Sequence, residues 1–377
     1  MQKEKQNIEF IQMLRGVAAI LVVFYHGREA INGIEGGTIA NILFMPGGAM
    51  GVDLFFLISG FIMVCTTWSN DGSLKSYIEF YIKRFSRVFP VYAAITILVL
   101  IIEAIAAASS YFDINFSGLI KALAFMPQGD RANGPIYGQL PLSVGWTLNY
   151  EMYFYLIFGV SLLFRRLRWI ALLSIAVITL VAIPFVTRSG VSTDTYKALN
   201  YSIVYLNLIT NPIIWLFIAG AGIGIAYKST LVIPSKFWAK IAVSTAATLV
   251  VWQYLSQYRA DHGIFMWGLS LVPLMLILTV ASKIMKIPTH PMLVRLGDIS
   301  FSLYLVHVPT KAAIQAILAF TGVPASGISF FILMVFASLI IATISHRYLE
   351  QTLSNWVRDR LLSFSNRSSK TLGATAT

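Results

Sequence analysis

Apolar side chains are grouped along the chain into ten segments of about 17–22 residues, separated by more polar connections. A helix needs ~20 mostly apolar residues to cross the hydrocarbon core of a bilayer. We therefore predict an all-α, polytopic integral membrane protein with about ten transmembrane helices. The predicted spans are residues 9–27, 50–68, 89–108, 145–164, 169–187, 207–226, 241–257, 264–283, 299–320 and 328–348.

Composition supports this fold class. Of 377 residues, 57% are hydrophobic and 12% are charged, whereas a soluble domain carries about 25% charged residues. A chain with half that charge cannot cover itself with a water-compatible surface. Cys65 is the single cysteine, which excludes an intrachain disulfide and a cysteine-based metal site. We predict no metal and no permanently bound cofactor.

Lys and Arg residues are divided unequally between the two alternating sets of connections. Twenty of the 28 lie in the set that holds both termini, and six lie in the other set. Because positive residues collect on the cytoplasmic side, we predict two cytoplasmic termini, an even number of spans and a location in the cytoplasmic (inner) membrane. The net charge of +12 then reflects orientation among membrane lipids and requires no nucleic-acid partner.

Residues 1–356 are predicted to form one transmembrane domain, because no polar stretch is long enough to fold as a separate soluble domain. The basic, Ser-rich residues 357–377 predict a disordered cytoplasmic tail. The first apolar segment has no obvious small-residue cleavage site after it and is expected to be a retained span. The longer connections, 28–49 and 109–144, are expected on the opposite side, where we interpret the second as a functional loop.

Two ionisable residues, Arg15 and His26, lie within the first predicted span. Eleven residues turn an ideal helix through about 1100°, so the two side chains share one face, separated by roughly 16.5 Å along the axis. Ionisable groups in a span are costly and often functional. The alternatives are a snorkelling Arg15 and an inter-helix hydrogen bond of His26.

Carboxylates occur near the outer ends of the second and fourth predicted spans, at Asp53 and Glu151. Asp53 is expected at about the depth of His26. An aspartate that orients one imidazole nitrogen leaves the other nitrogen basic, as in a histidine general base. The alternatives are a carboxylate favoured by the helix dipole for Asp53 and a structural partner of Arg or Tyr for Glu151.

Residues 74–88 predict an amphipathic cytoplasmic helix that carries Lys83, Arg84 and Arg87. Arg84 and Arg87 are three residues apart and therefore neighbours on one face. Paired guanidinium groups suit phosphate. The alternative is an anchor on anionic lipid headgroups.

The ninth predicted span carries Ser302, Tyr304 and His307, which together with Trp146 are candidate pocket residues. Small hydroxyls in spans are also common packing contacts, and His307 is equally consistent with a buried structural histidine. Gly220, Gly222 and Gly224 resemble a dinucleotide-binding motif, but no strand precedes them, so we interpret them as helix-packing glycines. His262, His290 and His346 lie near span ends and receive no role.

Five segments together resemble the acyltransferase-3 family of integral membrane acyltransferases. They occur in the family's order and cover most of residues 8–350. The segments are RGVAAILVVFYH (15–26), GVDLFFLISGF (51–61), KRFSRVFPVY (83–92), WTLNYEMYFY (146–155) and ISFSLYLVH (299–307).

This resemblance implies a ten-helix core that moves an acyl group, usually acetyl, from cytoplasmic acyl-CoA to a hydroxyl of an extracytoplasmic or lipid-linked glycan. It implies that His26 is the catalytic histidine, with Arg15 as its companion on the same helix. Arg84 and Arg87, beside Lys83, would contact the phosphates of acetyl-CoA or another short acyl-CoA, and Glu151 would be an essential acid. The WTLNYEMYFY segment is similar to members that acetylate exopolysaccharide or O-antigen.

The predicted mechanism passes the pantetheine arm of the acyl donor along the stripe between Arg15 and His26. His26, oriented by Asp53 or by Glu151, then removes the acceptor proton, with Arg15, Tyr304 or Ser302 as oxyanion donors. An acyl-histidine intermediate is equally compatible with these residues. The rival class is a proton-coupled transporter that uses the same residues as a relay, but the sequence lacks the repeat symmetry common in such folds.

Overall fold

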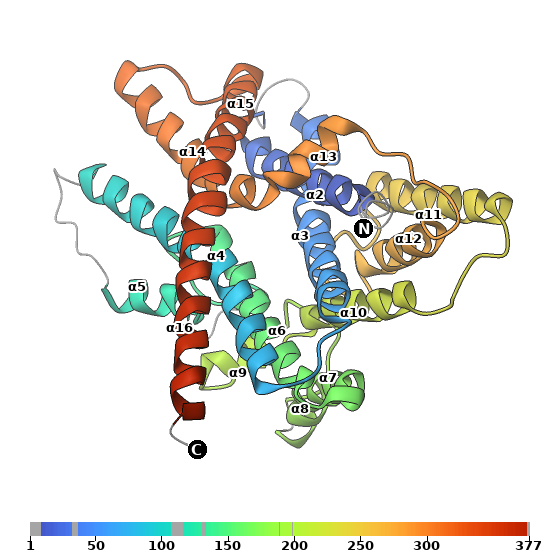
Figure 1. Cartoon of the computed structure of the whole chain (residues 1–377). Coiled ribbons are helices and arrows are strands. Elements are labelled where there is room, and N and C mark those ends of the chain that lie inside the picture. The colour runs from blue at the N-terminus through green and yellow to red at the C-terminus, as the bar shows by residue number, and fades with distance from the viewer. Residues whose placement is uncertain are drawn as a thin grey trace.

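The computed structural model describes residues 9–31, 37–106, 116–129, 133–187, 189–197 and 199–374, which contain helices and no strand (Figure 1). The principal helices are α2 (Glu9–Gly27), α3 (Gly37–Thr67), α4 (Leu74–Ala106), α5 (Phe116–Leu123), α6 (Trp146–Leu162), α7 (Arg168–Val177), α8 (Ile183–Val186), α9 (Val204–Ile209), α10 (Trp215–Lys228), α11 (Lys236–Ser256), α12 (Gly268–Ala281), α13 (Pro291–Asp298), α14 (Ser300–Thr321), α15 (Gly327–Ser345) and α16 (Ser354–Ala374).

Each of the ten predicted spans overlaps helices among the described residues, which confirms the all-α prediction for this part of the chain; the spans predicted at 207–226 and 264–283 also include non-helical residues. Within it, six helical segments are long and apolar enough to cross a membrane, and two shorter apolar helices cover residues 212–228 and 268–281. Large apolar side chains are exposed on the outer faces of α4 and α15, among them Leu98, Ile101, Phe336 and Ile340. Exposed apolar surface of this extent suits contact with lipid, and the chain is a multi-pass membrane protein.

Helix boundaries differ from the prediction in two places that bear on function. The amphipathic segment predicted at 74–88 and the span predicted at 89–108 form one continuous helix, α4. Helix α3 begins at Gly37, inside the connection predicted to be a loop, and continues through Pro46. The second loop, predicted at 109–144, lies partly outside the described residues, and its described part contains the short helix α5.

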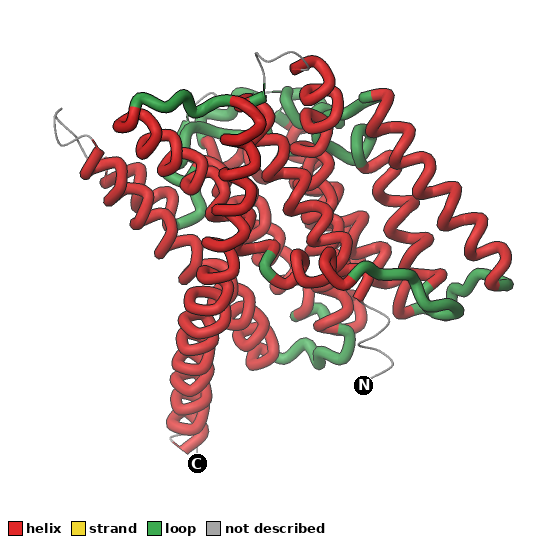
Figure 2. Tube along the Cα trace, turned by 90° about the horizontal axis from the view of Figure 1, so that it is seen from above, coloured by secondary structure: helices red, strands yellow, loops and turns green. Residues whose placement is uncertain are grey.

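The predicted disordered tail is instead largely helical. Residues 346–353 form a π-helix that joins α15 to α16, and α16 continues to Ala374. Helix α16 packs against α4, and its C-terminal part projects beyond the other helices (Figure 2). Residues 357–377 are basic and Ser-rich, and this composition suggested disorder. Packing of α16 against α4 supplies the contacts that stabilise the helix, which the composition alone does not reveal.

Glycines allow the central helices to approach closely. A Cβ atom at Gly220 on α10 would lie 2.0 Å from the carbonyl oxygen of Leu57 on α3, and one at Gly60 would lie 2.1 Å from that of Phe217. Gly224 also packs against α3, whereas Gly222 has no atom within 4 Å of its Cβ position. The packing interpretation is therefore confirmed for Gly220 and Gly224, while Gly222 faces open space.

Candidate active site

Three cavities follow one another along α3. The first, which we call the histidine cavity, has a volume of about 440 Å³ and is lined by His26, Trp146, His262 and Tyr304, among others. It is formed by α2, α3, α6, α14 and the α11–α12 connection. Helix α11 begins at a Ser235 cap and ends at Gln257, whose left-handed backbone (φ 54°) turns the chain into the connection that carries His262.

The second, the arginine cavity, is smaller, about 70 Å³, and its wall includes Arg15, Arg87 and Glu151. Val52 and Tyr304 line both this cavity and the histidine cavity, so the two are adjacent. The third is a cleft of about 130 Å³, which we call the Lys83 cleft, lined by Lys83, Arg84 and Thr66. From Val52 to Thr66, fourteen helical residues advance roughly 21 Å, about two thirds of a ~30 Å hydrocarbon core.

Hydrogen bonds fix the proton on the His26 ring. The Nδ1 of His307 lies 3.1 Å from the carbonyl oxygen of Leu303, which can only accept, so this nitrogen carries the proton. The Nε2 of neutral His307 is then an acceptor, and it lies 3.2 Å from the Nδ1 of His26. That Nδ1 also lies 3.0 Å from the carbonyl oxygen of Val22 and therefore donates to both. In the neutral ring, the Nε2 of His26 is therefore unprotonated, and His26 lines the histidine cavity.

Asp53 orients His262. Asp53 and Glu151 were the alternatives for the carboxylate that orients His26, and among the described residues neither is hydrogen-bonded to it. The Nδ1 of His262 lies 2.7 Å from Asp53 Oδ1, and the backbone N–H of Gly263 donates to Oδ2 at 2.8 Å. Asp53 is completely buried, whereas the His262 side chain is 11% exposed and lines the histidine cavity. The sequence analysis gave His262 no role. A signal did exist in the run YRADHG at 258–263, just after a predicted span, but nothing in it pointed to Asp53.

Glu151 accepts hydrogen bonds from two hydroxyls that lie in the same wall as Arg15. Ser59 Oγ donates to its Oε1 at 3.0 Å, and the Tyr155 hydroxyl donates to the same oxygen. The carboxylate faces the arginine cavity together with the guanidinium groups of Arg15 and Arg87. Glu151 is thus part of a charged site, and it also has the tyrosine partner that the structural alternative anticipated.

The predicted Arg84–Arg87 pair is divided between two cavities. Arg87 lines the arginine cavity, whereas Arg84 lies with Lys83 in the Lys83 cleft. The Nη2 of Arg84 donates to Thr66 Oγ1 at 2.8 Å. Its buried Nε has no hydrogen-bond partner among the described residues, so it remains able to donate to an anion.

Tyr304 and Trp146 lie where the pocket prediction expects them. The Tyr304 hydroxyl lies 3.0 Å from the Val144 carbonyl oxygen, to which it donates, and 2.9 Å from Thr147 Oγ1. Because its hydroxyl proton is already donated to Val144, Tyr304 is a poor oxyanion donor. The ring of Trp146 meets that of His262 edge-on, with centroids 5.5 Å apart.

Tyr196, from the connection before α9, also lines the histidine cavity. Burial, together with the nearby Asp261 carboxylate, raises the pKa of this phenol, so it stays protonated at neutral pH and can donate a hydrogen bond into the cavity.

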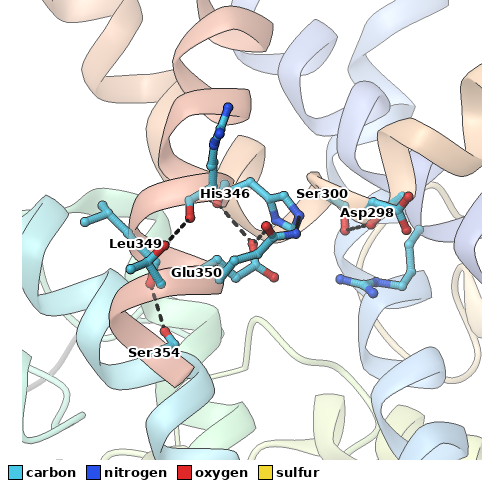
Figure 3. Close-up of polar contacts among 12 residues, drawn as sticks. Asp298, Ser300, His346, Leu349, Glu350 and Ser354 are labelled. Atoms are coloured by element: carbon cyan, nitrogen blue, oxygen red, sulfur yellow. Dashed lines mark hydrogen bonds and ion pairs between the residues drawn. The ribbon is translucent and has the colours of Figure 1, made fainter. Parts of the chain in front are cut away.

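Ser302 lies outside all three cavities, and its prediction as a pocket residue or oxyanion donor is wrong. Its Oγ donates to Glu350 Oε2 at 3.1 Å, and the same oxygen lies 2.9 Å from the Nδ1 of His346. Figure 3 shows the polar cluster around Glu350 and His346, where the π-helix passes the start of α14. Ser302 therefore joins α14 to the π-helix and lines none of the three cavities.

Replacing Ser302 by Ala is therefore expected to leave the acyl-transfer rate unchanged. Removing the hydroxyl should lower the free energy of unfolding by about 0.5–1.5 kcal/mol, the usual contribution of one hydrogen bond. Transfer assays and thermal unfolding of the purified variant in detergent measure the two quantities. A large loss of acyl transfer with unchanged stability would show that Ser302 does have a role in the site.

Comparison with known proteins gives the class of this protein. Residues 8–347 match the acyltransferase domain of the acyltransferase-3 family. The chain therefore belongs to the acyltransferase-3 family, as its motifs indicated. No solved structure matches it.

Three characterised relatives illustrate the family's range. The chain is 34% identical over 179 residues to exopolysaccharide production protein ExoZ of Rhizobium meliloti, covering 47% of this chain and 50% of that protein. It is 24% identical over 372 residues to peptidoglycan O-acetyltransferase OatA of Listeria monocytogenes, covering 92% and 56%. It is 25% identical over 336 residues to nodulation protein 10 of Rhizobium leguminosarum, covering 81% and 83%. The matches span about half the length of the first two relatives.

Proposed function

We propose that this protein is a membrane O-acyltransferase that moves an acyl group, most simply acetyl, from cytoplasmic acyl-CoA to a hydroxyl of a surface or lipid-linked glycan. The observation that carries the proposal is the unprotonated Nε2 of His26. His26 lines the histidine cavity, which adjoins the arginine cavity with Arg15 and Arg87 in its wall. Relatives named for exopolysaccharide production and peptidoglycan O-acetylation support a glycan acceptor.

We place the protein in the cytoplasmic membrane with ten spans and both termini inside. The six apolar helical segments that are long enough to span supply part of this count. Helices α6, α10, α11 and α12 are the further spans. The Lys83 cleft then opens toward the cytoplasm, and the histidine cavity lies toward the outer surface.

The acyl donor is proposed to run through the three cavities in series. Lys83 and Arg84 bind the CoA phosphates, because the cleft offers two cations and an unpaired guanidinium donor. The pantetheine arm passes Arg87 and Arg15 in the arginine cavity and enters the histidine cavity between Val52 and Tyr304. Glu151 supplies the negative charge that balances the arginines and keeps them in the wall of this passage.

His26 is the proposed reacting residue at the end of the passage. As a general base, its Nε2 takes the proton of the acceptor hydroxyl while the hydroxyl oxygen bonds to the thioester carbonyl carbon. The C–S bond then breaks, and the CoA thiolate recovers the proton. As a nucleophile, the same nitrogen would attack the carbonyl carbon itself. Both roles need the tautomer that His307 and Val22 impose.

Substitution of Arg84 by Ala is expected to raise the KM for acetyl-CoA without a comparable change in kcat. Loss of a hydrogen bond to a charged group costs about 1.5–3 kcal/mol, which corresponds to roughly 10- to 100-fold in KM. Steady-state kinetics of the purified protein in detergent measures this. Lys240→Ala, an exposed cation on α11, is the control, and an unchanged KM for Arg84→Ala would favour a lipid-headgroup anchor.

A further inference from the structure

Two histidines line the same cavity, and each has its Nδ1 nitrogen bound to an acceptor. His26 on α2 and His262 on the α11–α12 connection both line the histidine cavity. Behind each ring, an acceptor holds Nδ1: the Val22 carbonyl and His307 for His26, and the Asp53 carboxylate for His262. An acceptor at Nδ1 places a proton there. In the neutral form of each ring, the Nε2 is therefore unprotonated.

This arrangement restricts the chemistry that the two rings can share. A base paired with a general acid would need one ring to present an N–H from Nε2, which neither neutral ring has. A nucleophile paired with a base needs two unprotonated nitrogens, which two neutral rings provide. Transfer in two steps, first to a histidine and then to the acceptor, therefore fits the cavity better than a single displacement.

The groups behind the rings distinguish their roles. A carboxylate such as Asp53 compensates the positive charge that an imidazole acquires when it takes a proton. His307 is a neutral ring and gives His26 no such compensation, and the Lys311 ammonium donates to the backbone carbonyl of His26 at 2.8 Å. His262 is therefore the better proton acceptor, which leaves the attack on the thioester to His26, the other histidine of the cavity.

The contacts around His262 hold its ring in one orientation, as a catalytic base requires. Asp53 is completely buried and is bound by both the ring and the backbone of the same connection, at His262 Nδ1 and Gly263 N. Trp146 packs edge-on against the ring. The imidazole is thereby fixed in the cavity wall although it lies on a connection between helices.

We propose that His262, oriented by Asp53, is the general base for the acceptor hydroxyl and that His26 is the nucleophile that carries the acyl group. The inference rests on the proposed function. In the first step, the Nε2 of His26 bonds to the thioester carbonyl carbon, the C–S bond breaks and CoA leaves as thiolate. In the second, His262 takes the proton of the acceptor hydroxyl, whose oxygen bonds to the acyl carbon. The C–N bond to His26 then breaks. His262 gives its proton to solvent, and the CoA thiolate takes up a proton from solvent.

The test separates the two steps in purified full-length protein. Exchange of isotopically labelled CoA into acetyl-CoA, without acceptor, reports the first step alone. Acetyl transfer to de-O-acetylated surface glycan from the host cell reports both steps. We expect His262→Gln to retain exchange and to lose ~10²–10⁴-fold in transfer, the contribution of a general base. Asp53→Asn should show the same pattern, and His26→Ala should lose both reactions.

His290→Gln is the matched control, because His290 is exposed at the start of α13; both of its rates should equal those of the wild type. Exogenous imidazole should restore part of the transfer of a His262→Ala variant, which a merely structural role would not allow. Equal loss of exchange and transfer in both His262→Gln and Asp53→Asn, or an effect confined to the KM for the glycan, would overturn the inference.

Wild-type protein that transfers acetyl but shows no exchange would overturn the two-step scheme and leave the proposed function standing. Wild-type protein that performs neither reaction would contradict the proposed function itself.

Discussion

Replacement of His26 by Ala is expected to lower acetyl transfer at least ~10²–10⁴-fold. Loss of a general base costs this much, and loss of a nucleophile would remove the two-step route altogether. The variant removes the ring whose Nδ1 is bound to His307 and to the Val22 carbonyl. It should still bind acetyl-CoA, because Lys83, Arg84 and Arg87 lie in other cavities. Transfer assays with labelled acetyl-CoA and a parallel binding assay check both expectations.

His290→Gln again serves as the control for changing a histidine without touching the site. The assignment would be wrong if His26→Ala retained most of the wild-type transfer at equal protein level. A loss of transfer accompanied by an equal loss of acetyl-CoA binding would point instead to misfolding, which thermal unfolding in detergent detects independently.

Replacement of Gly220 by Ala is expected to destabilise the protein strongly. The added Cβ would lie 2.0 Å from the Leu57 carbonyl oxygen and 2.8 Å from its carbonyl carbon, which are backbone atoms of α3 and cannot move alone. Overpacking usually costs about 1–3 kcal/mol and sometimes more. Because α3 carries Asp53 and walls of all three cavities, transfer should fall together with stability.

Gly222→Ala is the matched control on the same helix. No atom lies within 4 Å of its Cβ position, and Ala is favoured over Gly in a helix by up to ~1 kcal/mol. The control should therefore unfold at the same or a higher temperature than the wild type in detergent. Equal unfolding temperatures for the Gly220 and Gly222 variants would contradict the close α3–α10 contact.

The positions of the helices could be predicted because long apolar runs have one structural solution in a bilayer. The boundaries at α3, α4 and α16 could not. Extension of α3 back to Gly37 and of α16 to Ala374 depends on neighbouring helices, which the local composition does not reveal.

Site residues could be predicted where their position along a helix was enough to identify them. His26, Arg15 and Glu151 were identified because charge is costly in apolar runs, and each lines a cavity. Ser302 was misplaced, although helical geometry could have warned against it. Two residues turn a helix by about 200°, so Ser302 and Tyr304 point to nearly opposite sides of α14.

The partner of Asp53 was beyond sequence reasoning for a different reason. Depth along a span predicts which side chains lie at one level, but the direction in which each points depends on how the helices are packed. His26 and His262 both occur at that level, and only the structure shows that Asp53 faces His262. The connection between α11 and α12, residues 257–267, thus contributes His262 to a site formed mainly by helices.

Acetyl transfer by the purified protein is the most direct test of the central claim that this membrane protein moves an acyl group from acyl-CoA to a glycan and needs His26 to do so. The protein in detergent is given acetyl-CoA labelled in its acetyl group and de-O-acetylated glycan from the host surface. We predict label in the glycan, as base-labile ester, with wild-type protein and not with His26→Ala. Label that stays in acetyl-CoA with the wild-type protein would contradict the account.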